Sequence, residues 1–290
     1  MSKNFSMRNF RTSALGAALL LATAFPSSAG AAEGVEIPRL NWTFSGLTGY
    51  FDKPQLRRGY QVYQNVCAVC HGMRQLYYRN LSEPGGPEFS EASVKAFASQ
   101  AQVTDGPNDE GEMFTRPGKP ADKFVSPYPN DKAAAAALGG AVPPDLSNMA
   151  KARAPAHTHA WYTEPYFWLV DILTGYQEGG PDYVHAVLTG YAEEPPAGID
   201  VLPGLSYNMA FPGHQIAMPP PLSDGLVTYE DGTPETVENY AKDVTAFLMW
   251  AAEPTLEERK KMGLTVMVYL AIFALLLYLS KRTLWRRVAH

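Results

Sequence analysis

The stretch RRGYQVYQNVCAVCHGM, residues 57–73, decides how the rest of the chain is interpreted. Asp52, shortly before it, is a suitable N-cap, and Pro54 falls in the first turn, where a missing N–H group is harmless. The stretch therefore predicts a helix that begins near Asp52, ends near Gly72 and presents both thiols inward. The residues that recur at helical spacing are Leu56, Tyr60, Tyr63, Cys67 and Cys70.

The two cysteines of the chain, Cys67 and Cys70, belong to the pattern Cys67-Ala68-Val69-Cys70-His71. A disulfide between them would close a very small loop and add little stability. The pattern is that of covalent c-type haem attachment. Two thiols one helical turn apart can add to the two vinyl groups of one haem edge, and the histidine that follows lies under the iron. We expect haem at both cysteines, with His71 as an axial ligand.

Two other kinds of site also use a C-x-x-C pair. A thioredoxin-like redox site needs a preceding strand in a βαβ context, whereas the periodicity here is helical. A zinc site needs two further ligands at a second cluster, and the sequence contains no other cysteine. The haem interpretation is therefore preferred.

The second axial ligand has to come from another part of the chain. Met218 lies in IAMPPPL (216–222), where three prolines fix φ and stiffen the backbone beside the thioether. Sulfur ligation favours reduced iron and raises the potential, which suits an electron carrier. Local chemistry favours Met218 and leaves open three competitors, Met149, Met209 and His214.

The N-terminal region has the pattern of a secretory signal peptide. Three basic residues precede an apolar run from Ala14 to Ala24, and small residues follow as far as Ala32. A run of about eleven apolar residues is too short to cross a bilayer, which takes about 20. We expect a signal peptide over residues 1–32, cut after Ala31 or Ala32.

Near the other end, GLTVMVYLAIFALLLYLS (263–280) contains no charged residue and has basic residues on both sides. It fits a membrane-spanning helix better than a buried core helix. Because the signal peptide exports the middle of the chain, we expect an exported domain over 33–258, an anchor over 259–282 and a short cytoplasmic tail over 283–290.

The segment between these ends is acidic. All 29 acidic residues but only 17 of the 24 basic ones lie between the signal peptide and the charge-free run, in residues 33–262, a net charge of −12. Such a surface disfavours nucleic acid and favours a basic protein partner by long-range attraction, although solubility alone would also account for it. The clusters expected to steer a partner contain Asp105, Asp109, Glu110, Glu112, Glu193 and Glu194.

Further helices are predicted along the exported segment. One follows Ser90, another covers 181–188, and an apolar stripe begins a strong helix at Thr233-Pro234. After Pro254, a capping box in TLEE (255–258) restarts helix into the anchor.

Long loops join these helices. Residues 102–148 contain one alanine-rich turn at 131–138 and, like residues 192–226, show weak periodicity and little sign of strand. Loops of this length inside a domain usually serve a site or cover a cofactor. The expected fold is mainly α.

Five segments resemble the cytochrome c1 family, in order over nearly the whole mature chain. They are RRGYQVYQNVCAVCHGM (57–73), GAVPPDLSNMAKARA (140–154), DYVHAVLTGY (182–191), MAFPGHQIAMPPPL (209–222) and DVTAFLMWAAEPTLEERKKMG (243–263). The haem motif alone is shared with many unrelated cytochromes, whereas PPDLS and WAAEP are far more specific.

The resemblance implies a cytochrome c-type domain with long loops, one C-terminal transmembrane helix and one haem whose axial ligands are His71 and Met218. It implies that Arg153 lies near a haem propionate, where a cation offsets buried negative charge; the alternative is an exposed helix charge. It further implies that Tyr183 and Pro143-Pro144 line the haem crevice.

The family is the haem subunit of ubiquinol–cytochrome c reductase, the bc1 complex. The resemblance therefore implies cytochrome b and a Rieske iron–sulfur protein as partners, and a soluble basic cytochrome c as electron acceptor. It places the haem domain on the periplasmic side of a bacterial inner membrane. Outer-sphere electron transfer needs no bond-making residue, so the chain is expected to be a redox subunit without catalysis of its own.

Two rival functions and two departures from the family pattern remain. The chain could be an anchored carrier of another complex, or a haem enzyme with an open sixth position. Residues 155–180 look like an insertion relative to short family members and have no assigned role. The chain also lacks the cysteines for an extra disulfide that some bacterial relatives carry.

Overall fold

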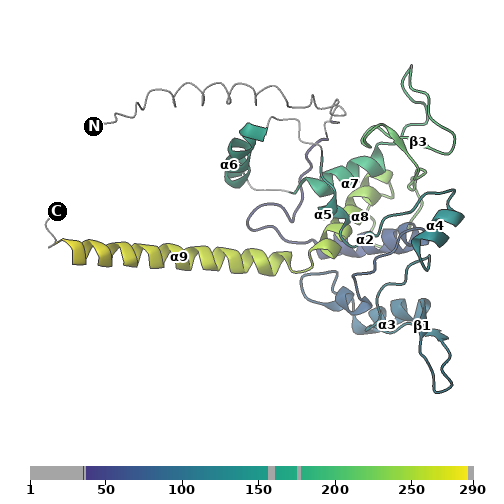
Figure 1. Ribbon diagram of the computed structural model, residues 1–290, viewed down its shortest axis with the longest axis horizontal. Helices are drawn as coiled ribbons and strands as arrows, with labels where there is room; N and C mark the ends of the chain where they lie inside the picture. Colours follow the sequence, from purple (N-terminus) through teal and green to yellow (C-terminus); the bar gives the residue numbers. More distant parts are fainter. Residues whose placement is uncertain (1–34, 36, 156–160, 175–177, 287–290) are drawn as a thin grey trace, which may run out of the picture. The chain divides into compact units, whose positions relative to one another are not determined.

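The computed structural model describes residues 35–286 except Glu36, 156–160 and 175–177. The expected signal peptide over 1–32 and the last residues of the expected tail lie outside this part of the chain. The described residues are mainly helical, as the sequence predicts, and the helices are joined by long irregular segments (Figure 1).

The centre of the fold is the crossing of α2 (Lys53–Asn65) with α8 (Val237–Ala252). Helix α8 is buried along most of its length because it also contacts α5 (Met149–Ala152) and α7 (Gly179–Thr189). The closest approach is at Gly59, where an added Cβ would lie 2.1 Å from the carbonyl oxygen of Asp243. Only glycine therefore fits at this point of the crossing.

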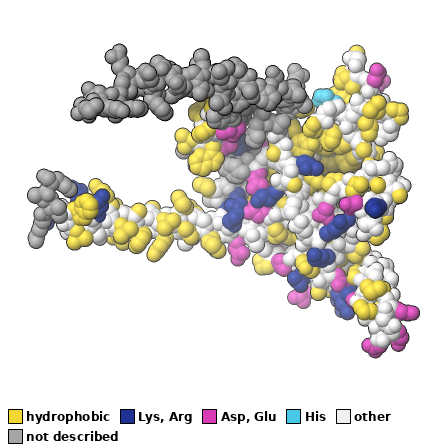
Figure 2. All heavy atoms as spheres, viewed as in Figure 1, with side chains coloured by type: hydrophobic (Ala, Val, Ile, Leu, Met, Phe, Trp, Pro, Cys, Tyr) yellow, Lys and Arg dark blue, Asp and Glu magenta, His cyan; other side chains and the backbone are white. Residues whose placement is uncertain are grey.

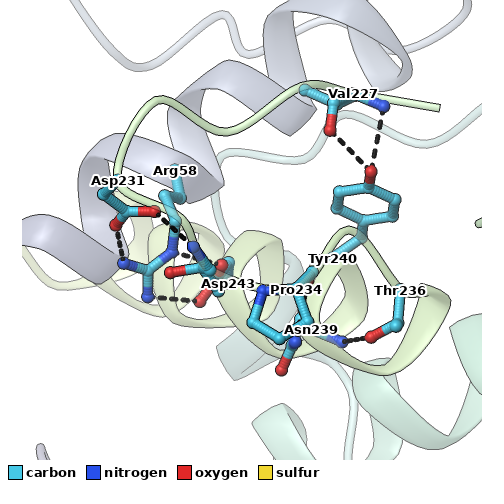
Figure 3. A network of polar contacts seen from close by, with 9 residues as sticks. Arg58, Val227, Asp231, Pro234, Thr236, Asn239, Tyr240 and Asp243 are labelled. Carbon is cyan, nitrogen blue, oxygen red and sulfur yellow. Dashed lines mark hydrogen bonds and ion pairs between the residues drawn. The ribbon is translucent and has the colours of Figure 1, made fainter. Parts of the chain in front are cut away.

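A polar network ties the same crossing to the segment before α8 (Figure 3). Arg58 of α2 donates to the carboxylate of Asp243 at 2.7 Å and to that of Asp231 at 2.6 Å. The Tyr240 hydroxyl donates to the carbonyl of Val227 and accepts from its N–H group. The network therefore helps to fix how α2 and α8 cross. Because each charged group has a partner, no buried charge is left unpaired.

Aromatic rings fill the space between α2, α8 and α3 (Glu91–Gln100). Tyr60 meets Phe97 and Phe247 with ring centroids 5.1 and 5.7 Å apart. Ser90 caps α3 by accepting from the N–H of Ser93, as the sequence predicts. Next to this layer, Tyr78 of η3 (Tyr78–Ser82) stacks on Phe124 at 4.4 Å. The core therefore fixes the direction in which α2 delivers the cysteine motif.

The prediction of one helix from Asp52 to Gly72 is wrong at its C-terminal end. Helix α2 ends at Asn65, and a 3₁₀ turn, η2 (Cys67–Val69), follows. Val66 departs from helical geometry, with φ −118° and ψ −58°, and the chain tightens from there. The N-terminal start is correct, although the Asp52 side chain makes no capping hydrogen bond.

The expectation of little strand is confirmed, since the described residues form only two small antiparallel pairs. Strand β1 (Gln102–Asp105) pairs with β2 (Phe114–Pro117), and β3 (Ser206–Tyr207) pairs with β4 (Gln215–Ile216). Strands of two to four residues are too short to give a readable alternation. The alanine-rich segment is a seven-residue helix, α4 (Asp131–Ala137), capped by Asn130.

Two helix starts also differ from the sequence prediction. Helix α8 begins at Val237 rather than at Thr233-Pro234, because the Thr236 side chain caps it through the N–H of Asn239. The capping box predicted in residues 255–258 does not form, since Thr255 makes no side-chain cap. In the same turn, the carboxylate of Glu257 accepts from the N–H of Phe51 at 2.7 Å.

The last helix, α9 (Leu256–Trp285), restarts after Pro254 as predicted. Its 30 residues include an 18-residue window of mean hydropathy 2.3, none of it buried. By length and composition it could cross a membrane. Helix α6 (Glu164–Thr174), preceded by η4 (Trp161–Thr163), lies in the segment that the sequence leaves without a role.

Candidate haem site

The two cysteines lie on the 3₁₀ turn η2. The N–H of Cys70 donates to the carbonyl of Cys67 at 3.1 Å, and the N–H of His71 donates to the same carbonyl at 2.9 Å. Side chains three positions apart are eclipsed in a 3₁₀ turn, so Cys67 and Cys70 project from one side. Both are half-buried, and burial raises the pKa of Cys67 to about 12, with the Cys70 thiol adding to the shift.

One ring nitrogen of His71 is already engaged. Its Nδ1 lies 2.9 Å from the carbonyl oxygen of Pro144, and because a carbonyl only accepts, Nδ1 carries the proton. The lone pair of Nε2 therefore remains available to a metal. Burial lowers the pKa of His71, against the opposing effects of Pro144 and Asp145, so the neutral imidazole that a metal requires is favoured.

Residues 145–147 are hydrogen-bonded to the segment that follows the cysteine motif, residues 72–75. The N–H of Leu146 donates to the carbonyl of Gly72 at 2.9 Å. Asp145 accepts from the N–H of Arg74 at 2.8 Å, and Ser147 accepts from the N–H of Gln75 at 3.0 Å. The family resemblance predicts Pro143-Pro144 as crevice residues, whereas Asp145 was not predicted. The position of Asp145 inside PPDLS could have indicated its role, because an aspartate side chain in a turn often binds backbone N–H groups.

Met218 follows the β3–β4 pair and is half-buried. Its carbonyl accepts from the hydroxyl of Tyr191 at 3.0 Å. Burial raises the pKa of Tyr191, so this hydroxyl stays protonated and able to donate. The backbone beside the thioether is therefore held by a hydrogen bond as well as by the prolines that follow. Tyr191, which the sequence does not single out, comes from the loop after α7.

A fully buried asparagine holds the base of the same loop. The side-chain amide of Asn208 donates to the carbonyl of Val187 at 2.8 Å. Its side-chain oxygen accepts from the N–H groups of Ala210 and Phe211, each at 3.0 Å. Asn208 thereby joins the Met218 loop to α7. An asparagine in a loop is common, and no sequence pattern distinguishes this one.

The other candidate ligands occupy different surroundings. Met209 is 53% exposed, and Met149 packs partly against the core at the start of α5. His214 stacks on Tyr207 and has its Nδ1 3.3 Å from the carbonyl oxygen of Asn208. Met218 stays the prediction for the second axial ligand.

Arg153 and Tyr183, which the resemblance assigns to the crevice, are brought together. Arg153 is the exposed C-cap of α5, and Tyr183 is half-buried on α7. Burial raises the pKa of Tyr183, and the positive charge of Arg153 opposes that rise, so the two side chains are electrostatic neighbours.

The donor set suits a haem rather than a bare metal ion. No cluster of three or more His, Cys, Asp or Glu side chains that could hold a metal ion occurs within the described residues. The motif instead offers two thiols on one side of a turn and one free imidazole nitrogen. Hydrophobic side chains gather on the face in Figure 2 over the area that lies between the labels α7, β3 and α4 in Figure 1. An apolar surface of this kind fits a porphyrin.

The acidic clusters differ in how much of their charge is available. Asp105 pairs with Arg116 at 2.5 Å, so its charge is partly offset. Asp109, Glu110 and Glu112 lie exposed on the loop between β1 and β2. Glu193 and Glu194 are also exposed, in the loop after α7.

Comparison with known proteins places these observations in one family. The model of the cytochrome C1 family matches residues 42–288. The cytochrome c1 of Rhodospirillum rubrum is 44% identical over 272 residues, which cover 89% of this chain and 90% of that protein. The protein of Solanum tuberosum named "Cytochrome c1-2, heme protein, mitochondrial" is 46% identical over 274 residues, 94% of this chain and 93% of that protein.

A third relative is a longer chain. The protein of Bradyrhizobium diazoefficiens named "Cytochrome b/c1" is 54% identical over 254 residues. The match covers 87% of this chain but only 36% of that protein.

Proposed function

The chain belongs to the cytochrome c1 family, and from this premise we propose that it is the haem subunit of a ubiquinol–cytochrome c reductase, the bc1 complex. The observation that carries the proposal is the hydrogen bond between His71 Nδ1 and the Pro144 carbonyl. It leaves Nε2 free next to two cysteines spaced for covalent haem attachment.

We assign each residue of the site a role toward one c-type haem. Cys67 and Cys70 would hold it through thioether bonds, while His71 Nε2 and the Met218 sulfur would be its axial ligands. When bound, the haem supplies a one-electron Fe(III)/Fe(II) couple. Pro144 keeps the imidazole in the required tautomer and orientation. No residue of the chain has to make or break a covalent bond during turnover.

Arg153 and Tyr183 complete the proposed crevice. The guanidinium of Arg153 would offset the negative charge of a propionate, and a cation at that position raises the reduction potential by disfavouring oxidised iron. The electrostatic influence of Arg153 on Tyr183 supports the assignment, because the resemblance places both residues at the crevice. The competing role for Arg153 is an exposed helix charge, which its exposure also permits.

The partners follow from the same premise. We propose cytochrome b and a Rieske iron–sulfur protein within the complex, with the Rieske protein as electron donor. The longer Bradyrhizobium relative, whose name joins b and c1, supports the association with a cytochrome b. A soluble basic cytochrome c would accept the electron, in a respiratory or photosynthetic chain.

The proposed location is the inner membrane of a bacterium. Helix α9 would cross the membrane once, with the haem domain over residues 33–258 on the periplasmic side and residues 283–290 in the cytoplasm. The length and hydropathy of α9 support the single crossing. The orientation rests on the signal peptide expected over residues 1–32.

Substitution of the axial methionine tests the haem proposal. Met218→Leu should remove the long-wavelength band of the oxidised protein and lower the reduction potential, because a sulfur ligand stabilises Fe(II). Met209→Leu is the matched control, since Met209 belongs to the same loop and is 53% exposed. The control should leave both the spectrum and the potential unchanged.

Other outcomes would reject parts of this proposal. If Met218→Leu kept its spectrum and potential, another residue would be the ligand. A wild-type spectrum that lacks a sixth ligand would favour a haem enzyme over a carrier. Purification of the full chain with a cytochrome b and a Rieske protein would separate the bc1 complex from any other anchored electron-transfer complex.

The acidic loop between β1 and β2 is proposed to steer the basic cytochrome c. Neutralising Asp109, Glu110 and Glu112 together should slow association and flatten its dependence on salt. The control removes three charges that are exposed elsewhere, Glu91, Glu230 and Glu258. Equal effects of the two triple variants would mean that net charge, and not this loop, controls association.

A further inference from the structure

The η4–α6 segment carries the densest run of exposed aromatic side chains among the described residues outside α9. Its sequence from Trp161 to Thr174 contains two acidic residues and no basic one. The exposed fractions are 70% for Tyr162, 66% for Tyr166, 37% for Phe167, 66% for Trp168 and 52% for Leu169. An exposed apolar surface of this kind marks a contact with a partner or a membrane.

One set of contacts ties α6 to the start of α9 through the N-terminal segment. Asp171 of α6 pairs with Arg39 at 3.5 Å. Five residues further along, the carbonyl of Phe44 accepts from Lys260 of α9 at 2.5 Å. Five residues span at most about 18 Å. Helix α6 is therefore tethered within a short distance of the first turns of α9.

A second set of contacts reaches the start of α9 from Glu178, which follows the C-terminal end of α6. Lys151 pairs with Glu178 at 3.3 Å and with Glu253 at 2.7 Å. Glu253 also binds Arg259 in the first turn of α9. Glu178 is four positions after Thr174, the end of α6, and four positions span at most about 14 Å. The C-terminal end of α6 is thus held near the start of α9 by two separate sets of contacts.

That part of α9 is where a membrane-spanning helix would enter the bilayer. Lys260 and Lys261 immediately precede the charge-free run that begins at Gly263. Leu47 and Tyr50, exposed by 70% and 59%, lie in the loop between Phe44 and Phe51 and border a cavity of about 680 Å³ beside α9. Exposed apolar side chains therefore gather around the entry point from more than one segment.

We propose that the η4–α6 segment is a second membrane contact, lying in the headgroup region of the bilayer beside the entry of α9. Tyrosine and tryptophan favour this region because their rings are apolar and their polar atoms stay hydrated. The inference rests on the proposed membrane anchoring by α9, and not on the haem. The segment has no Lys or Arg, so it would bind the apolar interface of zwitterionic lipid without needing anionic headgroups.

Nitroxide labels at three positions test the contact in the full-length chain, reconstituted in phosphatidylcholine nanodiscs. Trp168→Cys reports on α6, Leu264→Cys on the start of α9, and Met113→Cys on an equally exposed residue of the β1–β2 loop. The wild-type chain, treated with the same label, gives the background from Cys67 and Cys70. The readout is the collision rate with oxygen, which enters lipid, relative to that with a water-soluble nickel chelate.

The label at position 168 should give an oxygen-to-nickel ratio several-fold above that at position 113 and close to that at position 264. The oxygen-to-nickel ratio at position 168 should not change when anionic lipid is added. A ratio equal to that at position 113 would show α6 in water and overturn the proposal. Protection from both reagents would show a protein partner, or a second copy, on α6 and would also overturn it. A water-like ratio at position 264 would instead refute the anchoring by α9.

Discussion

The helix pair α2–α8 and the loop over residues 192–226 hold the two proposed axial ligands in different ways. His71 follows a helix that is packed against α8 over several turns, with glycine at the crossing and aromatic rings around it. Met218 lies in a loop that contains only the short β3–β4 pair and depends on individual hydrogen bonds. Packing positions the first ligand, and a few polar contacts position the second.

This difference has a consequence for function. A core helix is disturbed only by changes that affect the stability of the whole domain, because its contacts are shared among many residues. A loop held by single hydrogen bonds can loosen while the domain stays folded. We therefore expect variants of the two regions to separate global stability from ligation of Met218.

The largest effect is expected at the helix crossing. Gly59→Ala would place a methyl group 2.1 Å from the Asp243 carbonyl oxygen and force α2 and α8 apart. The free energy of unfolding should fall by about 3 kcal/mol, at the upper end for an overpacked core. Gly263→Ala is the control, because nothing lies within 4 Å of an added Cβ there. Denaturant unfolding of both variants measures the difference, and equal stability would contradict close packing at the crossing.

The buried asparagine should give the next largest effect. Asn208→Ala would leave the Val187 carbonyl and two N–H groups without their partner, at a cost of about 2 kcal/mol. Hydrogen exchange should increase in the loop around Met218 before it increases in α8. Asn148→Ala is the control, because it removes an exposed amide that is bound to Gln75. Its free energy of unfolding and its hydrogen exchange should change little. Uniform loosening of α8 and the loop would mean that the two regions are not independent.

A smaller effect, confined to the loop, is expected from Tyr191→Phe. The variant loses one hydrogen bond to the Met218 carbonyl, worth about 1 kcal/mol. An external ligand such as imidazole should then displace the thioether more readily, while the unfolding midpoint changes little. Tyr207→Phe is the control, since the Tyr207 hydroxyl forms no hydrogen bond within the described part of the chain. Equal displacement in both variants would show that Tyr191 does not hold the ligand.

The smallest effect should come from the β1–β2 region and depend on pH. The hydrogen bond from Arg116 lowers the pKa of Asp122 from 3.8 to about 2. A lowered pKa means that the ionised carboxylate stabilises the fold above about pH 4 and that this contribution is lost as the pH falls toward 2. Asp122→Asn should therefore be less stable than wild type at pH 6, by less than about 1 kcal/mol. The two proteins should converge near pH 2, and a difference that persists there would exclude this ion pair as its cause.

Local patterns in the sequence predicted several elements because their causes are local. Ser90 caps α3, the segment around 181–188 is α7, and Pro254 separates α8 from α9. The same patterns placed the end of α2 six or seven residues too late, because helical spacing does not distinguish a 3₁₀ turn from continued α-helix. They also predicted a capping box at Thr255, whose side chain makes no capping hydrogen bond.

The sequence by itself determined the chemistry of this chain. The spacing of Cys67, Cys70 and His71, the stiff segment around Met218 and the charge-free run before Ser280 are all contained in short stretches of residues. Only the tertiary structure decided which groups orient these residues. The Pro144 carbonyl is 73 positions from His71, and the Tyr191 hydroxyl is 27 positions from Met218. Hydrogen bonds over such separations depend on how the chain packs, and no local pattern records them.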